Sequence, residues 1–142
     1  MPLNQVEISY YTKSSNNDAV STIKEIKTII PYSTLYTHIY KSAQLIFINE
    51  VLEKTLQEHQ QDNSMFTFLT EVLISMDKQE YNPWFHLSFL VRYMSYLGIE
   101  PDITNSNNAP YFDLEQGVFT HAQPKHFIKG NLLNCFVELI NN

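Results

Sequence analysis

The sequence predicts a mainly α protein of the α+β class, and three observations predict it. Apolar residues recur at helical spacing in three long segments between residues 33 and 97. Short stretches typical of strands occur near residues 6–30 and 111–120. The 142-residue chain holds only three glycines, fewer than a turn-rich all-β fold needs.

Two strands are predicted ahead of the first helix. The first shows a period of two, because every second residue is apolar at Val6, Ile8 and Tyr10. This alternation indicates a strand with one buried face. Because of this alternation, only one of Tyr10 and Tyr11 is expected to be exposed. Residues 22–30 are rich in β-branched side chains and end at Pro31. We therefore separate a two-stranded segment, residues 1–30, from a helical domain, residues 31–142.

The first two long helices are predicted by capping residues and apolar spacing. One begins at Ser33 or Thr34 and runs to about Glu58. Because its middle is apolar nearly all round, it is expected to be buried on more than one side. The other covers about residues 64–77, with apolar side chains at three- and four-residue spacing.

The remaining elements are a third helix, a hairpin and a closing helix. Asn82 and Pro83 begin the third helix, and Gly98 ends it in the left-handed conformation. Residues 111–114 and 118–120 flank Gly117 and form a small hairpin at 111–120. The closing helix follows Pro124 and carries its apolar residues between 132 and 140.

The sequence contains none of the common catalytic or phosphate-binding motifs. Cys135 is the single cysteine, which excludes an intramolecular disulfide and a cysteine-cluster zinc site. Its place in the closing helix predicts a buried side chain rather than a reactive thiol. We therefore expect no catalytic residue, no cofactor and no bound metal, and we regard an enzyme as the weakest of the alternatives.

Charge and hydropathy argue against nucleic acid and membranes as direct binding partners of this chain. The net charge is −6, with four basic against three acidic residues in 1–41 and five against twelve in 42–142. This balance is unfavourable for autonomous binding to a nucleic-acid backbone. No apolar run approaches the roughly 18 residues of a membrane span, and the first residues lack the pattern of a signal peptide. A cytoplasmic, reducing setting without membrane attachment is expected.

Arg92 is the only arginine in the chain, and it lies in the middle of the third helix. A guanidinium at this place either forms an internal ion pair, with Glu50 or Glu71 as partners, or anchors an acidic ligand. The sequence leaves both interpretations open.

The order of the helical segments resembles the helical part of the RecO recombination-mediator family. The third helix reads Phe89-x-x-Arg92 and continues to Leu97-Gly98-x-x-Pro101, after Phe47–Leu52 in the first helix and Phe66-x-x-Leu69 in the second. The hairpin at 111–120 is similar to the family's segment after its zinc knuckle. The resemblance covers nearly the whole chain, although each motif consists mostly of core residues.

The resemblance implies a role in recombinational DNA repair. The family loads recombinase onto strands coated with single-stranded-DNA-binding protein and anneals complementary strands. Its barrel binds nucleic acid, and its helical part binds the acidic, Phe-terminated tail of that protein and the ring-forming RecR partner. For this chain the resemblance implies a protein-binding module that is not an enzyme. The tail would use Phe85, Phe89 and Tyr93 as an apolar slot and Arg92 as its cation, with Lys125 and Lys129 adding attraction.

Two departures from the family pattern affect these expectations. Residues 1–30 look like only the last two strands of the family's oligonucleotide-binding barrel (OB-fold), so weak or no nucleic-acid binding is expected from this chain alone. Many members carry CxxC pairs after the Leu-Gly-x-x-Pro segment, and their absence here predicts that the zinc knuckle is lost. A helical adaptor unrelated to DNA remains the alternative function.

Overall fold

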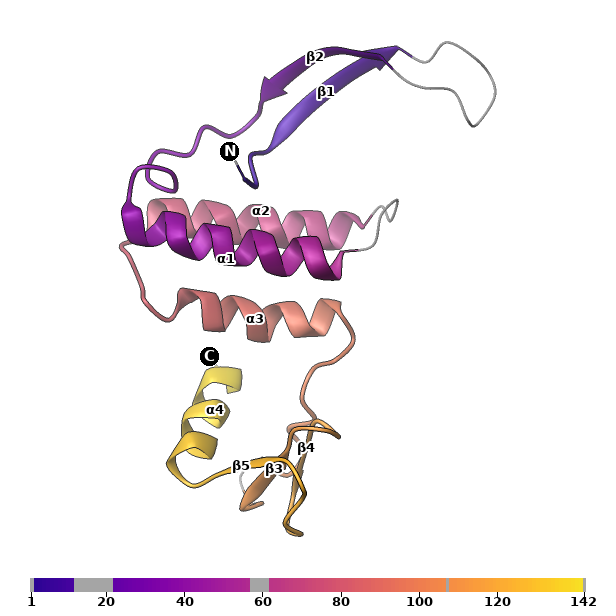
Figure 1. Ribbon diagram of the computed structural model, residues 1–142, viewed down its shortest axis with the longest axis vertical. Coiled ribbons are helices and arrows are strands. Elements are labelled where there is room, and N and C mark those ends of the chain that lie inside the picture. The colour runs from indigo at the N-terminus through magenta and orange to yellow at the C-terminus, as the bar shows by residue number, and fades with distance from the viewer. Residues whose placement is uncertain (1, 12–21, 57–61, 107, 142) are drawn as a thin grey trace. The chain divides into compact units, whose positions relative to one another are not determined.

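The computed structural model describes residues 2–11, 22–56, 62–106 and 108–141. The chain divides into two compact units, Met1–Tyr81 and Asn82–Asn142, called here the N-terminal and C-terminal units. The described residues form four helices and two small antiparallel sheets (Figure 1). The predicted α+β class, with helices predominating, is confirmed.

The N-terminal unit begins with a ribbon of two antiparallel strands, β1 (Val6–Tyr11) and β2 (Thr22–Thr28). Both strands lie where the sequence predicts them. The expectation of one buried face is wrong, because every residue of both strands is exposed. Tyr10 and Tyr11 are 62% and 58% exposed, so the prediction that only one would be accessible is also wrong.

Helix α1 covers Ile39–Thr55, a later start than the sequence predicts. Ser33 and Thr34 do not cap it, because both are bound to the end of the next helix. The chain makes a turn in which the His38 N–H donates to the Thr34 oxygen at 2.9 Å, and the His38 side chain caps the helix. The expectation that α1 is buried on more than one side is wrong, because Ile46 and Phe47 are 54% and 37% exposed. The buried residues follow one side of the helix at three- and four-residue spacing: Lys41, Gln44, Leu45, Ile48 and Leu52.

Helix α2 covers Asn63–Lys78 and begins at Asp62, whose carboxylate accepts the N–H groups of Ser64 and Met65. These bonds, together with that from the Ser64 hydroxyl, lower the pKa of Asp62. The predicted helix is confirmed to within one residue at each end. The buried apolar side chains of this unit come from α1, α2 and the preceding turn: Leu35, Leu45, Ile48, Leu52, Met65, Phe68, Val72, Leu73 and Met76.

The C-terminal unit begins with α3, which covers Phe85–Tyr96. The prediction that Asn82 caps this helix is wrong, because the N-cap is Trp84, which makes no side-chain capping bond. The Asn82 side chain accepts the Trp84 N–H at 2.9 Å in the turn before the helix. Gly98 has φ of +69°, and the N–H groups of Gly98 and Ile99 donate back to Ser95 and Met94. The predicted glycine terminus is confirmed, and the bonding pattern is that of a Schellman motif.

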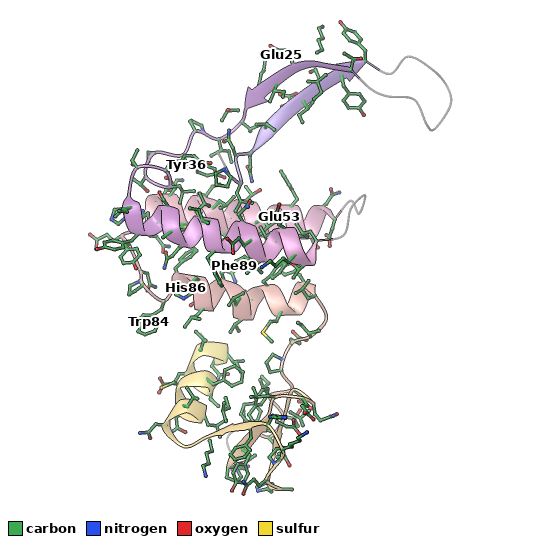
Figure 2. The ribbon with its side chains drawn as sticks, viewed as in Figure 1. Glu25, Tyr36, Glu53, Trp84, His86 and Phe89 are labelled. Atoms are coloured by element: carbon green, nitrogen blue, oxygen red, sulfur yellow. The ribbon has the colours of Figure 1, made fainter. Side chains whose placement is uncertain are left out.

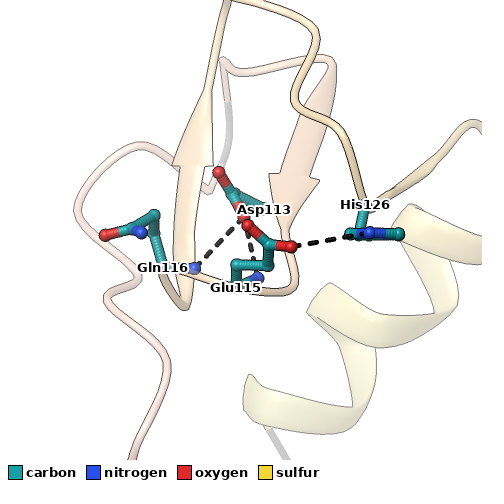
Figure 3. Close-up of polar contacts among 4 residues, drawn as sticks. All are labelled: Asp113, Glu115, Gln116 and His126. Carbon is teal, nitrogen blue, oxygen red and sulfur yellow. Dashed lines mark hydrogen bonds and ion pairs between the residues drawn. The ribbon is translucent and has the colours of Figure 1, made fainter.

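A three-stranded antiparallel sheet follows, made of β3 (Tyr111–Asp113), β4 (Val118–Thr120) and β5 (Phe127–Lys129). The hairpin of β3 and β4 is confirmed. In its turn the Asp113 carboxylate accepts the N–H groups of Glu115 and Gln116, as Figure 3 shows. The sequence did not predict β5, which pairs with the other edge of β3 and gives the order β4-β3-β5.

The closing helix α4 covers Asn131–Asn141 and packs against α3 and β5. A core of aromatic and aliphatic residues joins it to the sheet: Ala109, Phe112, Phe119 and Leu133, with Ile128, Phe136, Val137 and Ile140 around them. Cys135 is exposed, so the expectation of a buried thiol is wrong. In the described part of the chain, no helix is long and apolar enough to cross a membrane.

Candidate protein-binding site

Helix α3 carries four of the six residues predicted to bind a partner. Phe85 and Arg92 are two turns apart and lie on one side of the helix, with Phe89 between them. Tyr93 follows Phe89 by one turn. All four side chains belong to one continuous helix that ends at Gly98, so their spacing along it is fixed.

The aromatic residues of the predicted slot differ in accessibility. Phe89 and Tyr93 are 2% and 1% exposed, and their rings stack with centroids 5.3 Å apart. Phe85 is half-buried. Figure 2 labels Phe89 on this helix, together with Trp84 and His86 near its start. Of the three predicted rings, Phe85 is therefore the one that solvent reaches.

The Arg92 side chain is exposed, and its main-chain oxygen accepts the Ser95 hydroxyl at 2.8 Å. Tyr96 follows it by one turn and is 40% exposed. A cation and an aromatic ring at this spacing lie beside each other on a helix surface. Tyr96 is not among the predicted site residues, although its spacing from Arg92 is a signal that could have identified it.

Lys125 and Lys129 are both exposed, and Lys129 lies in β5. The Lys129 ammonium is 5.6 Å from the centroid of the Phe127 ring, a cation–π contact. Because α4 packs against both β5 and α3, one helix connects the strand of Lys129 with the helix of Arg92. Arg92 and Lys129 thus lie on two elements that both contact α4, and Lys125 lies in the loop before β5.

The electrostatic field of this unit is weak. Residues 82–142 carry three basic residues, which are all members of the predicted site, against five acidic ones. Glu115 lies 3.5 Å from the His126 ring (Figure 3), and Lys125 precedes His126 in the sequence. The Thr104 hydroxyl and N–H lower the pKa of Asp102, which keeps its charge at neutral pH. An acidic ligand would therefore be held by local contacts rather than by a strong field.

A second polar cluster, which the sequence did not predict, lies at the C-terminal end of α2. The Lys41 side chain is 5% exposed, and its ammonium donates to the Thr34 hydroxyl and to the main-chain oxygens of Asp77 and Gln79 at 2.6–3.1 Å. A surface pocket of about 410 Å³ adjoins it, lined by Thr34, Thr37, His38, Lys41, Glu80 and Tyr81. All three Lys41 protons bind the protein itself, so the cluster is structural.

Asp77 completes this cluster. Partial burial raises the pKa of its carboxyl, but hydrogen bonds from the N–H groups of Ser33, Thr34 and Leu35 outweigh burial and hold the pKa well below its usual range. Tyr32 nearby has a raised pKa, caused first by burial and then by Tyr36 and Asp77. The charged form of Asp77 is therefore part of the folded state.

The segment after Pro101, for which the sequence predicts the loss of a zinc knuckle, is held by main-chain contacts. The Asp102 N–H donates to the Gly117 oxygen at 2.9 Å, and Asp102 forms a bridge with Val118. Ala109, at the end of this segment, enters the core. Among the described residues no group of three or more histidine, cysteine or acidic side chains could hold a metal ion.

Comparison with known proteins defines the class. A family model described as "Recombination protein O C terminal" matches residues 37–123, more than half of the chain. That range includes α1, α2, α3 and the β3–β4 hairpin. The chain thus contains the C-terminal region of a recombination protein.

Curated relatives identify the family. The chain is 35% identical over 140 residues to the DNA repair protein RecO of Flavobacterium johnsoniae, covering 99% of this chain and 58% of that protein. It is 31% identical, with the same coverage, to the DNA repair protein RecO of Flavobacterium psychrophilum. It is 36% identical over 128 residues to the DNA repair protein RecO of Azobacteroides pseudotrichonymphae, covering 88% of this chain and 52% of that protein. The chain belongs to the RecO family and spans about half the length of these relatives. No solved structure matches it.

Proposed function

We propose that this chain acts in DNA repair and recombination as a protein-binding module of a RecO-type mediator, without catalysis of its own. Its partners are the acidic C-terminal tail of single-stranded-DNA-binding protein and a RecR-type protein. Residues that precede this sequence in full-length relatives supply most of the DNA contact. The proposal rests on family membership, on the family model that covers α1 to β4, and on the acidic balance of residues 42–142.

One observation carries the choice of binding site. Arg92, the only arginine, is exposed on α3 with Tyr96 one turn away on the same side. A Phe-terminated acidic peptide needs a cation for its carboxylates and apolar surface for its ring. Arg92 offers the forked donor, while Phe85 and Tyr96 offer aromatic surface that solvent reaches. Phe89 and Tyr93 are buried and lie next to these residues along the same helix.

The weak electrostatic field of the C-terminal unit limits the affinity that we expect for the acidic peptide. With only Lys125 and Lys129 to add long-range attraction, we expect a dissociation constant of tens of micromolar, or about −6 kcal/mol. Added salt should weaken binding, because the contribution of these charges is screened.

The decisive experiment is a fluorescence titration of a labelled acidic peptide ending in Phe against the wild type and Arg92→Ala. Lys78→Ala is the matched control, since Lys78 is an exposed cation at the end of α2, in the other unit. The proposal expects binding by the wild type and the control and at least about tenfold weaker binding by Arg92→Ala. Absence of binding by the wild type, or equal binding by all three proteins, would refute the site.

A second peptide tests the aromatic half of the proposal. The same acidic sequence with Ala in place of the terminal Phe should bind weakly to the wild type. Tyr96→Ala should reduce the affinity for the Phe-terminated peptide but not for the Ala-terminated one. Such a difference would separate recognition of the ring from nonspecific attraction of an acidic chain to Arg92.

A further inference from the structure

The pocket of about 410 Å³ beside Lys41 lies where the first turn of α1 meets the residues after α2. The Lys41 ammonium joins the two segments, because it binds the main-chain oxygens of Asp77 and Gln79. Figure 1 shows the start of α1 beside the end of α2. Five of the six lining residues fall within the range that the C-terminal family model matches. The pocket therefore belongs to the helical region of the chain and not to the β1–β2 ribbon.

Three aromatic rings gather at this pocket. The His38 and Tyr81 rings, which both line it, stack with centroids 5.6 Å apart and planes 25° apart. The Tyr40 ring lies 5.2 Å from that of Tyr81. Tyr40 and Tyr81 are 60% and 38% exposed. Rings this close cannot enclose a ligand between them, so a ligand would lie against their outer faces.

The rings are held in place by the start of α1. The His38 ring accepts the Lys41 N–H through Nδ1 at 3.4 Å, as the cap of the helix. Tyr81 stacks on that ring, and Tyr40 is the second residue of the same helix. The aromatic surface is therefore formed by the fold before any ligand binds.

Two chemical groups commonly stack on exposed aromatic rings, namely nucleobases and the guanidinium group of arginine. A nucleobase brings phosphates, which need cations at the site. The Lys41 protons already bind the Thr34 hydroxyl and the oxygens of Asp77 and Gln79 at 2.6–3.1 Å. Lys78, the exposed cation at the end of α2, does not line the pocket. The site therefore lacks a donor for a phosphate.

Glu80 supplies the charge that a guanidinium needs. It lines the pocket directly before Tyr81, and its side chain is exposed. In the described part of the chain, no hydrogen bond or ion pair engages its carboxylate. An arginine on the Tyr81 ring would gain a cation–π contact and, from the carboxylate, charge-assisted hydrogen bonds.

The charge around the pocket has the same sign as Glu80. Residues 31–81 carry three basic residues against seven acidic ones. A surface with this balance attracts a cationic segment and repels a phosphate backbone. Charge thus selects the guanidinium over the nucleobase as the occupant of this aromatic surface.

We propose that this pocket binds an arginine side chain from a basic segment of a partner protein. The guanidinium stacks on the outer face of the Tyr81 ring, and its N–H groups bind the Glu80 carboxylate. The Thr37 hydroxyl, which donates its own proton to the Ser33 oxygen at 3.1 Å, accepts a further N–H. The site belongs to the N-terminal unit, whereas peptide binding is proposed at α3 of the C-terminal unit. Either site can therefore fail without the other.

Fluorescence anisotropy of the full chain with labelled peptides at low salt tests the proposal. The probe is a peptide of three Gly-Ser-Arg repeats. Matched peptides carry citrulline, which keeps the shape of arginine without its charge, or lysine, which keeps the charge without the planar fork. The arginine peptide should bind at least about tenfold more tightly than the citrulline peptide and at least about threefold more tightly than the lysine peptide.

Variants locate the site on the protein. Glu80→Gln and Tyr81→Leu should each weaken binding of the arginine peptide at least about fivefold. Glu53→Gln is the matched control for charge, on the exposed side of α1 in the same unit (Figure 2 labels Glu53). Tyr10→Leu is the control for loss of an exposed tyrosine. Both controls should bind within about twofold of the wild type. Circular dichroism would check that all four variants keep the helical content of the wild type.

Three results would overturn the proposal. Equal binding of the arginine and lysine peptides would mean that only net charge attracts them. Equal losses in Glu80→Gln and Glu53→Gln, or no loss in Tyr81→Leu, would place the binding elsewhere. A labelled oligothymidylate that binds the wild type and is lost in Tyr81→Leu would show that a nucleobase, and not an arginine, occupies the ring.

Discussion

Asp77 caps the turn that begins at Thr34, from 43 positions further along the chain. Its Oδ1 accepts the Thr34 N–H at 2.7 Å, and its main-chain oxygen accepts the Thr34 hydroxyl at 2.7 Å. The same carboxylate accepts the N–H groups of Ser33 and Leu35 at 3.0 Å. This contact joins the segment before α1 to the end of α2 and sets where α1 begins.

We predict that Asp77→Asn destabilises the N-terminal unit by about 2–4 kcal/mol at pH 7. The amide keeps one acceptor oxygen but loses the charge that strengthens several hydrogen bonds. Urea unfolding followed by circular dichroism would measure the loss. Glu53→Gln, an exposed carboxylate on α1, is the control and should change stability by less than about 0.5 kcal/mol. Equal stability of Asp77→Asn and the wild type would contradict this role.

The pKa of Asp77 also predicts how stability depends on pH. Because the folded-state pKa lies below the ordinary value, the stabilisation is fully present above about pH 4 and is lost as the pH falls towards the folded-state pKa. The difference in unfolding free energy between the wild type and Asp77→Asn should therefore shrink between about pH 5 and pH 2. A difference that is constant over this interval would mean that the charge does not contribute.

We expect Lys41→Met to cost about 2–4 kcal/mol, although methionine is close to lysine in size and shape. The substitution leaves the Thr34 hydroxyl and the oxygens of Asp77 and Gln79 without the buried ammonium that binds them. Thermal unfolding of this variant beside Lys54→Met, an exposed lysine of the same helix, would isolate the effect of burial. Similar losses in the two variants would argue against the buried hydrogen bonds as the cause.

Gly98→Ala should destabilise the C-terminal unit by about 1 kcal/mol. Gly98 has φ of +69°, and an added Cβ would meet no atom within 4 Å, so the cost is conformational rather than steric crowding by neighbours. Gly98→Asn should cost less, because asparagine tolerates this conformation better than alanine does. Chemical denaturation of the three proteins would establish the order, and an alanine variant more stable than the asparagine variant would contradict it.

For single-stranded DNA we expect binding weaker than micromolar at physiological salt. Residues 1–41 carry four basic residues against three acidic ones, which allows few phosphate contacts. Tyr10 and Tyr11 are both exposed, and each could stack on a base for about 1–3 kcal/mol. Fluorescence anisotropy with a labelled oligonucleotide would measure the affinity of the wild type for single-stranded DNA. The same titration of a Tyr10→Ala/Tyr11→Ala variant would measure the contribution of the two tyrosines. Micromolar or tighter binding by the wild type would show that the ribbon is a nucleic-acid site.

The elements that the sequence predicts well are those with local signals. The apolar spacing of α2 and the glycines at 98 and 117 each act within a few residues. Alternation likewise located β1, but it indicates only that a strand has two faces, not that either face is covered. The expectation of a buried face failed for that reason.

The features that the sequence did not reveal depend on distant partners. The start of α1 follows from Asp77, and β5 exists because three residues pair with β3. For the candidate site, the sequence identified Arg92 and the aromatic residues of α3. It could not distinguish the buried rings of Phe89 and Tyr93 from the accessible ring of Tyr96, because all belong to the same apolar spacing.

The strand order β4-β3-β5 has a consequence for synthesis on the ribosome. The central strand is made first, so Phe112 leaves the ribosome before Ile128 and Leu133, which complete its surroundings in the core. Until α4 has been translated, no helix covers the apolar side of the nascent sheet. A chain stopped near residue 130 would leave that side exposed permanently. Such a truncated product should be a substrate for chaperones and proteases, because exposed apolar surface and unpaired strand edges promote aggregation.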